Sequence, residues 1–141
     1  MKLTPYLNFN GTCAEAFAYY EKHLGAKTTV SMTFGQMPAP ATPPPGTENL
    51  VLHARIALGD TYLMASDVAP TMPWEPMRSA YLTLNVDSSA EAERIHTALA
   101  DGGEIFMPLQ ETFYAHKFSM LRDKFGINWM VIHEKPMPNP A

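Results

Sequence analysis

The amino-acid sequence predicts an α+β fold built from two tandem β-α-β-β-β repeats. Three observations carry this prediction: a strand-and-helix pattern that recurs 75 positions along the chain, two proline-rich segments, and a glycine turn near the end of each half. A chain of 141 residues fits one ordinary domain. We therefore expect a single domain over residues 1–141, with repeat one at about 1–68 and repeat two at about 79–135.

The first strand and helix of each repeat are visible as matching patterns. YLNFN at 6–10 recurs as YLTLN at 81–85, and both alternate apolar and polar residues as half-buried strands do. At the same offset, each half contains four residues spaced by four, three and four positions, a spacing that places them on one face of a helix. These residues are Cys13, Phe17, Tyr20 and Leu24 in the first half, and Ser88, Ala92, Ile95 and Leu99 in the second.

Both predicted helices have recognisable ends. The Ser/Thr-x-x-Glu spacing of a capping box precedes each helix, as Thr12 with Glu15 and as Ser88 with Glu91. Gly25 and Gly102 follow the helices and supply the left-handed stop.

Three further strands are expected in each repeat. AKTTVSMTFG at 26–35 and GEIFMPLQETF at 103–113 form the first of them. The segments 49–67 and 116–134 each read as a hairpin, with Gly59 and Gly126 at the turns. These glycines are 67 positions apart, because the first half carries a longer proline loop.

Thirteen prolines divide the chain. Five fall in MPAPATPPPG at 37–46, where fixed φ angles and missing N–H groups predict a surface loop or flap. A second proline-rich connector covers 69–77 and separates the halves, and a short tail follows at 136–141.

Composition excludes several classes of protein. Ten Lys and Arg against 14 Asp and Glu give no broad positive surface for nucleic acid. No apolar run approaches a membrane span, and the N-terminus lacks the apolar core of a secretory signal, so we expect neither a membrane partner nor export. Cys13 is the single cysteine, which excludes an internal disulfide and fits a reducing cytoplasm.

Three motifs make the chain resemble the PhnB-like branch of the vicinal oxygen chelate superfamily, which includes glyoxalases, bleomycin-resistance proteins and extradiol dioxygenases. They are TPYLNFNGTCAEAFAYYEKHLGA at 4–26, HARIALGDTYLMASD at 53–67 and QETFYAHKFSMLRDKFGINWMV at 110–131. The resemblance implies two half-barrel sheets around a concave cavity, helices outside, and a homodimer. Some PhnB-like proteins are labelled demethylubiquinone methyltransferases. This sequence gives that label no support, because it lacks a Gly-rich strand-to-helix turn for a nucleoside cofactor.

The resemblance also implies where a divalent metal would be held, on the first and last strand of each repeat. The first strands offer Thr4, Tyr6 and Asn8, then Tyr81, Thr83 and Asn85. Leu63 or Met64, and Met130, stand where relatives have a Glu. None of these is a usual ligand for a catalytic divalent ion, so no metal is expected at the usual positions and no cofactor is assigned.

Polar side chains remain on the third strands. Leu50, Leu52, Ala54, Ile56 and Leu58 form one apolar face, which leaves Val51, His53 and Arg55 on the other. In the second repeat a regular strand would place Tyr114, His116, Phe118, Met120 and Arg122 on the matching face. The predicted ligand contacts are His53, Arg55, Tyr114, His116, Arg122, Tyr6 and Asn8, which suit an anionic or carbonyl-bearing organic molecule.

Structural interpretations of these residues stay open. His53 can equally be a hydrogen-bonded core histidine, and the arginines can pair with Glu111 or Asp123 to fix strand register. The favoured function is non-enzymatic binding of a small organic molecule. The alternative is an enzyme of the lyase, isomerase or dioxygenase type, with His53 as general base or with His53, Glu111 and His116 as an atypical metal site.

Overall fold

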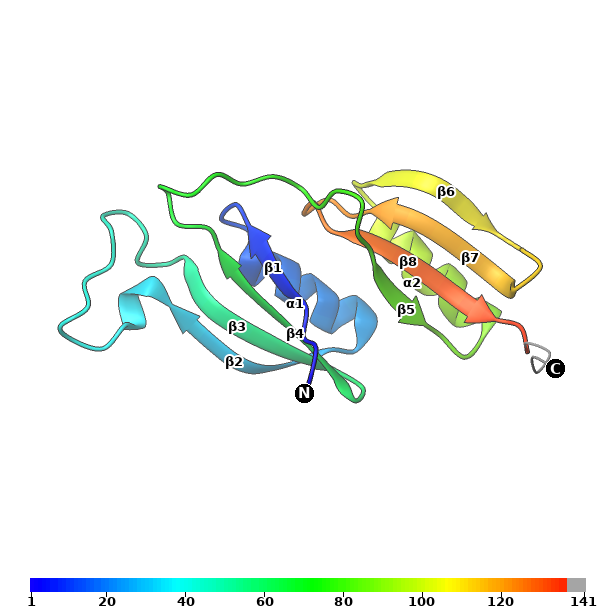
Figure 1. The fold of residues 1–141 in the computed structure, drawn as a ribbon, viewed down its shortest axis with the longest axis horizontal. Coiled ribbons are helices and arrows are strands. Elements are labelled where there is room, and N and C mark those ends of the chain that lie inside the picture. Colours follow the sequence, from blue (N-terminus) through cyan, green and yellow to red (C-terminus); the bar gives the residue numbers. More distant parts are fainter. Residues whose placement is uncertain (137–141) are drawn as a thin grey trace. The chain divides into compact units, whose positions relative to one another are not determined.

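Each predicted repeat forms one four-stranded sheet with one helix. The computed structural model describes residues 1–136, so all but the first residue of the predicted tail lies outside the described part. The chain divides into two units, Met1–Trp74 and Glu75–Ala141. Figure 1 shows the elements of each unit in chain order.

Unit 1 contains β1 (Tyr6–Phe9), α1 (Cys13–Leu24), β2 (Lys27–Thr33), a 3-10 turn η1 (Phe34–Gln36), β3 (Val51–Leu58) and β4 (Thr61–Asp67). Its strands lie in the order β1-β4-β3-β2. β1 runs parallel to β4, and the other neighbours are antiparallel. This is the predicted β-α-β-β-β order.

Unit 2 contains β5 (Leu82–Asn85), α2 (Ser89–Ala100), β6 (Glu104–Gln110), β7 (Ala115–Arg122) and β8 (Asn128–Glu134). Its strand order is β5-β8-β7-β6, with β5 parallel to β8 and the rest antiparallel. The topology repeats that of unit 1, so the repeat found by sequence offset is confirmed.

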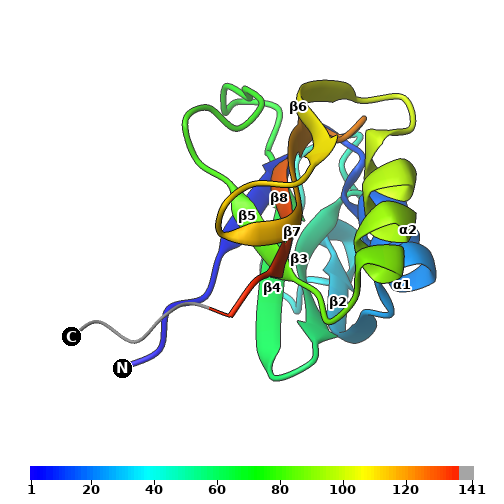
Figure 2. The same cartoon turned by 90° about the vertical axis from the view of Figure 1, so that its right-hand side faces the viewer.

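One face of each sheet packs against the helix of the same unit, as Figure 2 shows for α2 beside β7. In unit 1, Phe17 and Tyr20 of α1 are buried together with Leu7 and Phe9 of β1 and Ile56 of β3. In unit 2 the buried helical residues are Ala92, Ile95 and Leu99. The helical stripes in the sequence therefore identified most of the residues on the helix faces that form the cores. Two of the predicted residues differ, because Ser88 is the exposed residue that precedes α2 and Leu24 is only half-buried.

The helix ends follow the predictions only in part. Ser88 Oγ accepts a hydrogen bond from the Glu91 amide at 3.1 Å, as expected. The Thr12 cap is wrong, because its side chain makes no cap hydrogen bond. Asp67 of β4 accepts from the Cys13 amide instead, at 2.9 Å. Gly25 ends α1 at φ 70°, and Gly102 adopts φ 73° just past α2.

Strand irregularities change which side chains share a face. The β2–β3 register shifts between Met32 and Thr33. Val51 lines a small pocket beside α1 together with Cys13 and Ala54, so its predicted place beside His53 and Arg55 is wrong. The β7–β8 register shifts between Ala115 and Lys117. A β-bulge inserts one extra residue and re-aims its neighbours.

The proline-rich segments lie outside the strands and helices. Residues 37–46 form a loop between η1 and β3, as predicted. Buried Thr47 anchors its end through a hydrogen bond from Oγ1 to the Pro44 carbonyl at 2.6 Å. In the connector, the Trp74 indole N–H donates to the Asn8 carbonyl at 2.9 Å. No helix among residues 1–136 is long and apolar enough to span a membrane.

Candidate functional site

The sheet face of unit 1 that α1 does not cover, here called the open face of unit 1, carries the polar residues singled out from the sequence. Leu7 and Phe9 of β1 are buried, so the alternate residues Tyr6 and Asn8 point to the open face. The Tyr6 ring stacks on the His53 ring, with centroids 5.7 Å apart and an interplanar angle of 19°. The Tyr6 hydroxyl and His53 Nδ1 are hydrogen-bonded at 3.1 Å.

Arg55 lies two residues further along the same strand. Its guanidinium carbon is 4.6 Å from the centre of the Tyr62 ring, a cation–π geometry. Arg55 Nε donates to Thr29 Oγ1 at 2.9 Å. Within unit 1, Arg55 has no carboxylate within ion-pair distance. Its predicted pairing with Glu111 or Asp123, which belong to unit 2, stays a prediction.

Asn8 and two residues of β4 complete the open face of unit 1. Asn8 pairs with Ser66 in register, and Ser66 Oγ donates to Asn8 Oδ1 at 3.2 Å. Tyr6 pairs with Met64 in the same way. Tyr6 and Tyr62 keep 46% and 44% of their surface exposed, so aromatic rings and polar groups are presented together on this face.

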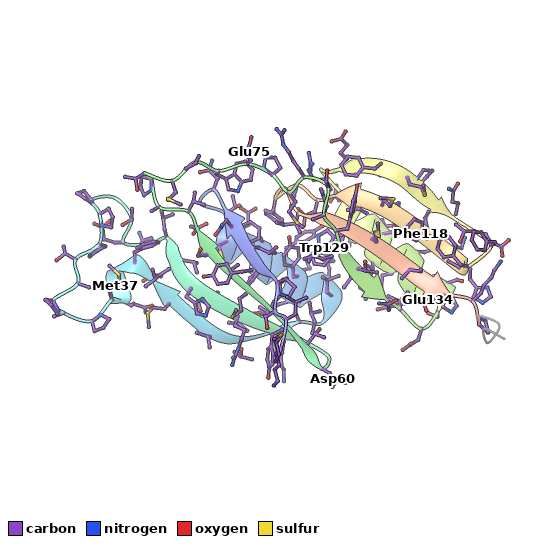
Figure 3. All side chains as sticks on the ribbon, in the orientation of Figure 1. Met37, Asp60, Glu75, Phe118, Trp129 and Glu134 are labelled. Atoms are coloured by element: carbon purple, nitrogen blue, oxygen red, sulfur yellow. The ribbon has the colours of Figure 1, made fainter. Side chains whose placement is uncertain are left out.

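The open face of unit 2 has a different character. Ala115, Phe118 and Ile132 form a buried apolar cluster, and four further side chains pack on it: Met107, Tyr114, Met120 and Met130. The Tyr114 ring contacts Phe118 edge-on, at 5.7 Å between centroids. Tyr114 thus lies beside Phe118 as the sequence predicted, with its ring used for packing. Figure 3 labels Phe118 on β7.

Arg122 is engaged by its own unit. Its Nε donates to Asn128 Oδ1 at 3.0 Å, and its Nη2 donates to the Met77 carbonyl at 2.7 Å. The prediction that Arg122 pairs with Glu111 or Asp123 is therefore wrong. Glu111 pairs with Lys135 at 3.2 Å, and Asp123 accepts from the amides of Phe125 and Ile127 in the turn.

The strand face predicted for His116 is wrong. Its ring lies 4.7 Å from the ring of His133, and His133 is hydrogen-bonded to Ser89 at the start of α2. His116 therefore lies on the helix side of β7, away from Phe118 and Arg122. The prediction assumed a regular strand, whereas the bulge between Ala115 and Lys117 reverses the alternation.

The positions at which the resemblance implies a metal can be read from the strand pairing. Open-face residues of the first and last strands pair as Tyr6 with Met64, Asn8 with Ser66, Thr83 with Met130, and Asn85 with Ile132. Leu63 is buried on the helix side of the sheet, so Met64 is the residue that stands where relatives have a Glu. Phenol, amide, hydroxyl and thioether groups do not fit a catalytic divalent cation, which prefers imidazole and carboxylate ligands.

The atypical metal set remains a prediction. His53 belongs to unit 1, whereas Glu111 and His116 belong to unit 2. Within residues 1–136 no three His, Cys, Asp or Glu side chains are grouped as a metal site.

Burial shifts the pKa of two side chains outside the open faces. Burial, reinforced by the Asp67 carboxylate, raises the pKa of the Cys13 thiol to about 12, which keeps it protonated and unreactive. Burial lowers the pKa of His96, and His96 Nδ1 is hydrogen-bonded to Ser119 Oγ at 2.9 Å. Sequence reasoning missed the His96 contact, because its partner Ser119 lies on β7, 23 positions away.

Comparison with known proteins identifies the family. The family model described as 3-demethylubiquinone-9 3-methyltransferase matches residues 1–132, and the chain belongs to that family. It is 37% identical over 150 residues to the protein YjdN of Escherichia coli strain K12, covering 98% of this chain and 99% of YjdN.

Solved structures agree with this assignment. Protein PA1353 from Pseudomonas aeruginosa is 45% identical, with a TM-score of 0.87 over 96% of this chain and 99% of that one. A PhnB protein from Bacillus cereus, titled a putative 3-demethylubiquinone-9 3-methyltransferase, is 25% identical, with a TM-score of 0.81 over 94% and 99%.

A more distant structure supports the fold alone. A glyoxylase/bleomycin resistance protein/dioxygenase domain from Frankia is 14% identical, with a TM-score of 0.61 over 94% of both chains. The chain is thus a PhnB-like protein with the glyoxalase/bleomycin resistance fold, and the predicted family is confirmed.

Proposed function

We propose that this protein binds a small organic molecule, bearing an anionic or carbonyl group and an apolar body, on the open face of unit 1. The strongest support is that a histidine and an arginine on this face each lie against a tyrosine ring. His53 is stacked on Tyr6, and Arg55 lies over Tyr62, on one face of one sheet.

The chemistry of these groups suits such a ligand. Among the described residues, Thr29 Oγ1 accepts a hydrogen bond from Nε of the Arg55 guanidinium. The terminal N–H groups therefore remain for a carboxylate, phosphonate or carbonyl oxygen. The tyrosine rings supply apolar walls that lose little conformational entropy on binding. Asn8, linked to Ser66, adds an amide for orientation.

Three predicted contacts belong to unit 2. Tyr114 and Arg122 remain proposed contacts, although each also has a packing or hydrogen-bonding role in its own unit. His116 is not proposed as a contact of this ligand, because its ring lies beside His133 on the helix side of β7.

A second candidate function is catalysis with His53 as a general base. The hydrogen bond between the Tyr6 hydroxyl and His53 Nδ1 supports it, because this bond fixes the ring and directs Nε2 elsewhere. If Nδ1 carries the proton, Nε2 is the basic nitrogen that could accept one from a substrate. Isomerisation, addition and C–C cleavage are the reactions consistent with such a base.

A ligand panel tests the binding proposal. Small carboxylates, phosphonates and hydroxylated aromatics are screened for an increase in melting temperature, which binding to the folded state produces by mass action. Hits are then measured by calorimetry on His53→Ala and Arg55→Ala, with the exposed Arg78→Ala as control. We expect both site variants to lose at least about tenfold in affinity. Affinities equal to wild type for every hit would refute the site.

The metal-dependent alternative has a separate test. Untagged protein purified without chelator is analysed for Mn, Fe, Co, Ni and Zn, and divalent ions are titrated into wild type, His53→Ala and Glu111→Ala. A stoichiometric ion that both variants lose would support an atypical centre of His53, Glu111 and His116. Absence of such an ion, or binding unchanged in the variants, would reject it.

Assembly and location are also proposals. We propose a homodimer, supported by family resemblance and by the 62% exposed Met72 in the connector. Trp74 is a weaker candidate for the contact than the sequence suggested, because its indole N–H is bonded within unit 1. Sedimentation showing a monomer at micromolar concentration would contradict a dimer. The single cysteine supports a cytoplasmic location.

A further inference from the structure

We propose that His116 and His133 form a second site, for a borderline divalent cation such as Cu²⁺, Ni²⁺ or Zn²⁺, on the helix side of β7 and β8. This site lies within unit 2 and is independent of the ligand site proposed on unit 1. Imidazole nitrogens are favoured ligands of these three ions.

The bulge in β7 creates the pair. Ala115 pairs with Glu134 and Lys117 pairs with His133, so His116 is the extra residue of β7 at this point. Its ring is thereby turned toward His133, with centroids 4.7 Å apart and an interplanar angle of 37°. In a regular strand His116 and Lys117 would point to opposite faces, and the two histidines would be separated by the sheet.

Ser89 orients one of the two rings. Its Oγ is hydrogen-bonded to Nδ1 of His133 at 3.1 Å. A metal-binding histidine commonly uses its second ring nitrogen in this way, which fixes the ring and leaves the other nitrogen for the ion. Nε2 of His133 is therefore the nitrogen assigned to the metal.

The second ring is accessible. His116 is exposed at the surface of β7, whereas His133 is half-buried. Among the described residues neither ring has a carboxylate within ion-pair distance. Two nitrogens in one tetrahedral shell, each about 2.0–2.1 Å from the ion, lie roughly 3 Å apart, and rings in contact reach that separation by small side-chain rotations. Figure 3 labels Glu134, the neighbour of His133 at the end of β8.

In the described part of the chain only two protein ligands are available to the ion, which limits the site to modest affinity. Lys117 pairs with His133 across the strands, but its ammonium group is 3.5 Å from the Glu93 carboxylate, which offsets its charge. No third His, Cys, Asp or Glu joins the pair among residues 1–136. Water therefore completes the coordination shell, and the ion keeps exchangeable positions.

Titration of untagged full-length protein with Cu²⁺, Ni²⁺ and Zn²⁺ by calorimetry tests this site. We expect one ion per chain, and a loss of at least about tenfold in affinity for His116→Gln and for His133→Gln. His23→Gln, a histidine of α1, serves as the matched control and keeps wild-type affinity. Unfolding curves of each variant establish that the tested proteins are folded.

Electron paramagnetic resonance of the Cu²⁺ complex gives an independent readout, with coupling to two imidazole nitrogens expected. Absence of binding by the wild type, unchanged affinity in either His116→Gln or His133→Gln, or coupling to a single imidazole would overturn the proposal. Loss of the ion in His53→Ala would instead assign it to the atypical centre, and failure of either test leaves the ligand site on unit 1 untouched.

Discussion

The two units share one topology but use their open faces differently. In unit 1 the face presents His53, Arg55 and two half-exposed tyrosines. In unit 2 the residue that aligns with His53, at the 67-residue offset of the hairpin glycines, is Met120. The open face of unit 2 is occupied by a packed cluster that includes Phe, Ile and Met side chains. The two repeats therefore keep the same helix-packed core while their open faces differ, since only the core fixes the strand alternation.

The aligned arginines show the same contrast. Arg55 donates one N–H to Thr29, and its guanidinium lies over the exposed ring of Tyr62. Arg122 binds the connector carbonyl of Met77 and the side chain of Asn128. Arg55 thus keeps its terminal N–H groups for a ligand, whereas Arg122, which is also a proposed contact, holds the chain that enters β5.

The largest expected difference concerns the buried aspartates. Asp123 accepts from the Phe125 and Ile127 amides and from the Trp129 indole N–H, whereas Asp67 accepts from the Cys13 and Val51 amides. We expect Asp123→Ala to lower the free energy of unfolding by about 3–4 kcal/mol and Asp67→Ala by about 2–3 kcal/mol, because buried donors are left unpaired. Urea unfolding measures both.

Asp60→Ala, in the exposed β3–β4 turn, is the control for the aspartates and should change the unfolding free energy by less than about 0.5 kcal/mol. A larger loss for Asp67→Ala than for Asp123→Ala would contradict the assignment of Asp123 as the more heavily used anchor.

The arginines give the next largest effect. Arg122→Ala removes two hydrogen bonds and should cost about 2 kcal/mol, while Arg55→Ala should cost less than about 1 kcal/mol. Ligand affinity should respond in the reverse order. Chemical denaturation and calorimetry on the same two variants test this, and equal losses of stability would break the contrast between the units.

Helix caps provide a smaller contrast. Ser88→Ala should destabilise by about 1 kcal/mol, since Ser88 caps α2. Thr12→Ala should cost less than about 0.5 kcal/mol, because Asp67 supplies the cap of α1. Comparable losses in thermal unfolding would show that Thr12 caps α1 in solution.

The smallest effect is a pH dependence that arises in unit 2. Because burial lowers the pKa of His96 in the folded protein, the unfolded chain binds a proton more readily at that residue. Its contribution to stability is complete above about pH 6.5 and decreases as the pH falls below that value. His96→Gln, which keeps a partner for Ser119, should reduce the decrease. An unchanged pH profile of the unfolding free energy would contradict this role.

The elements and the helix-packed cores could be predicted from sequence because they follow local rules. A strand alternation, a helical stripe and a glycine turn are each visible within a few residues, and the 75-residue offset confirmed them against a second copy. Tyr6, Asn8, His53 and Arg55 were placed on one face by the same rule.

What the sequence did not predict depends on distant partners or on one extra residue. The bulge at His116 leaves no compositional mark, yet it moves that side chain to the opposite face. Asp67, which takes the capping role predicted for Thr12, accepts from the Cys13 amide 54 positions away. Arg122 donates to Met77 and Asn128 in place of an acidic residue. Such contacts form only once the strands are paired.

An amide chemical-shift map of the labelled protein with a hit from the ligand panel tests whether the ligand binds on the open face of unit 1. We predict that the shifts concentrate on unit 1, at residues 6–8, 53–55 and 62–66, and disappear in Arg55→Ala. Shifts confined to unit 2, or a map unchanged by that substitution, would contradict the assignment of the ligand site to the open face of unit 1.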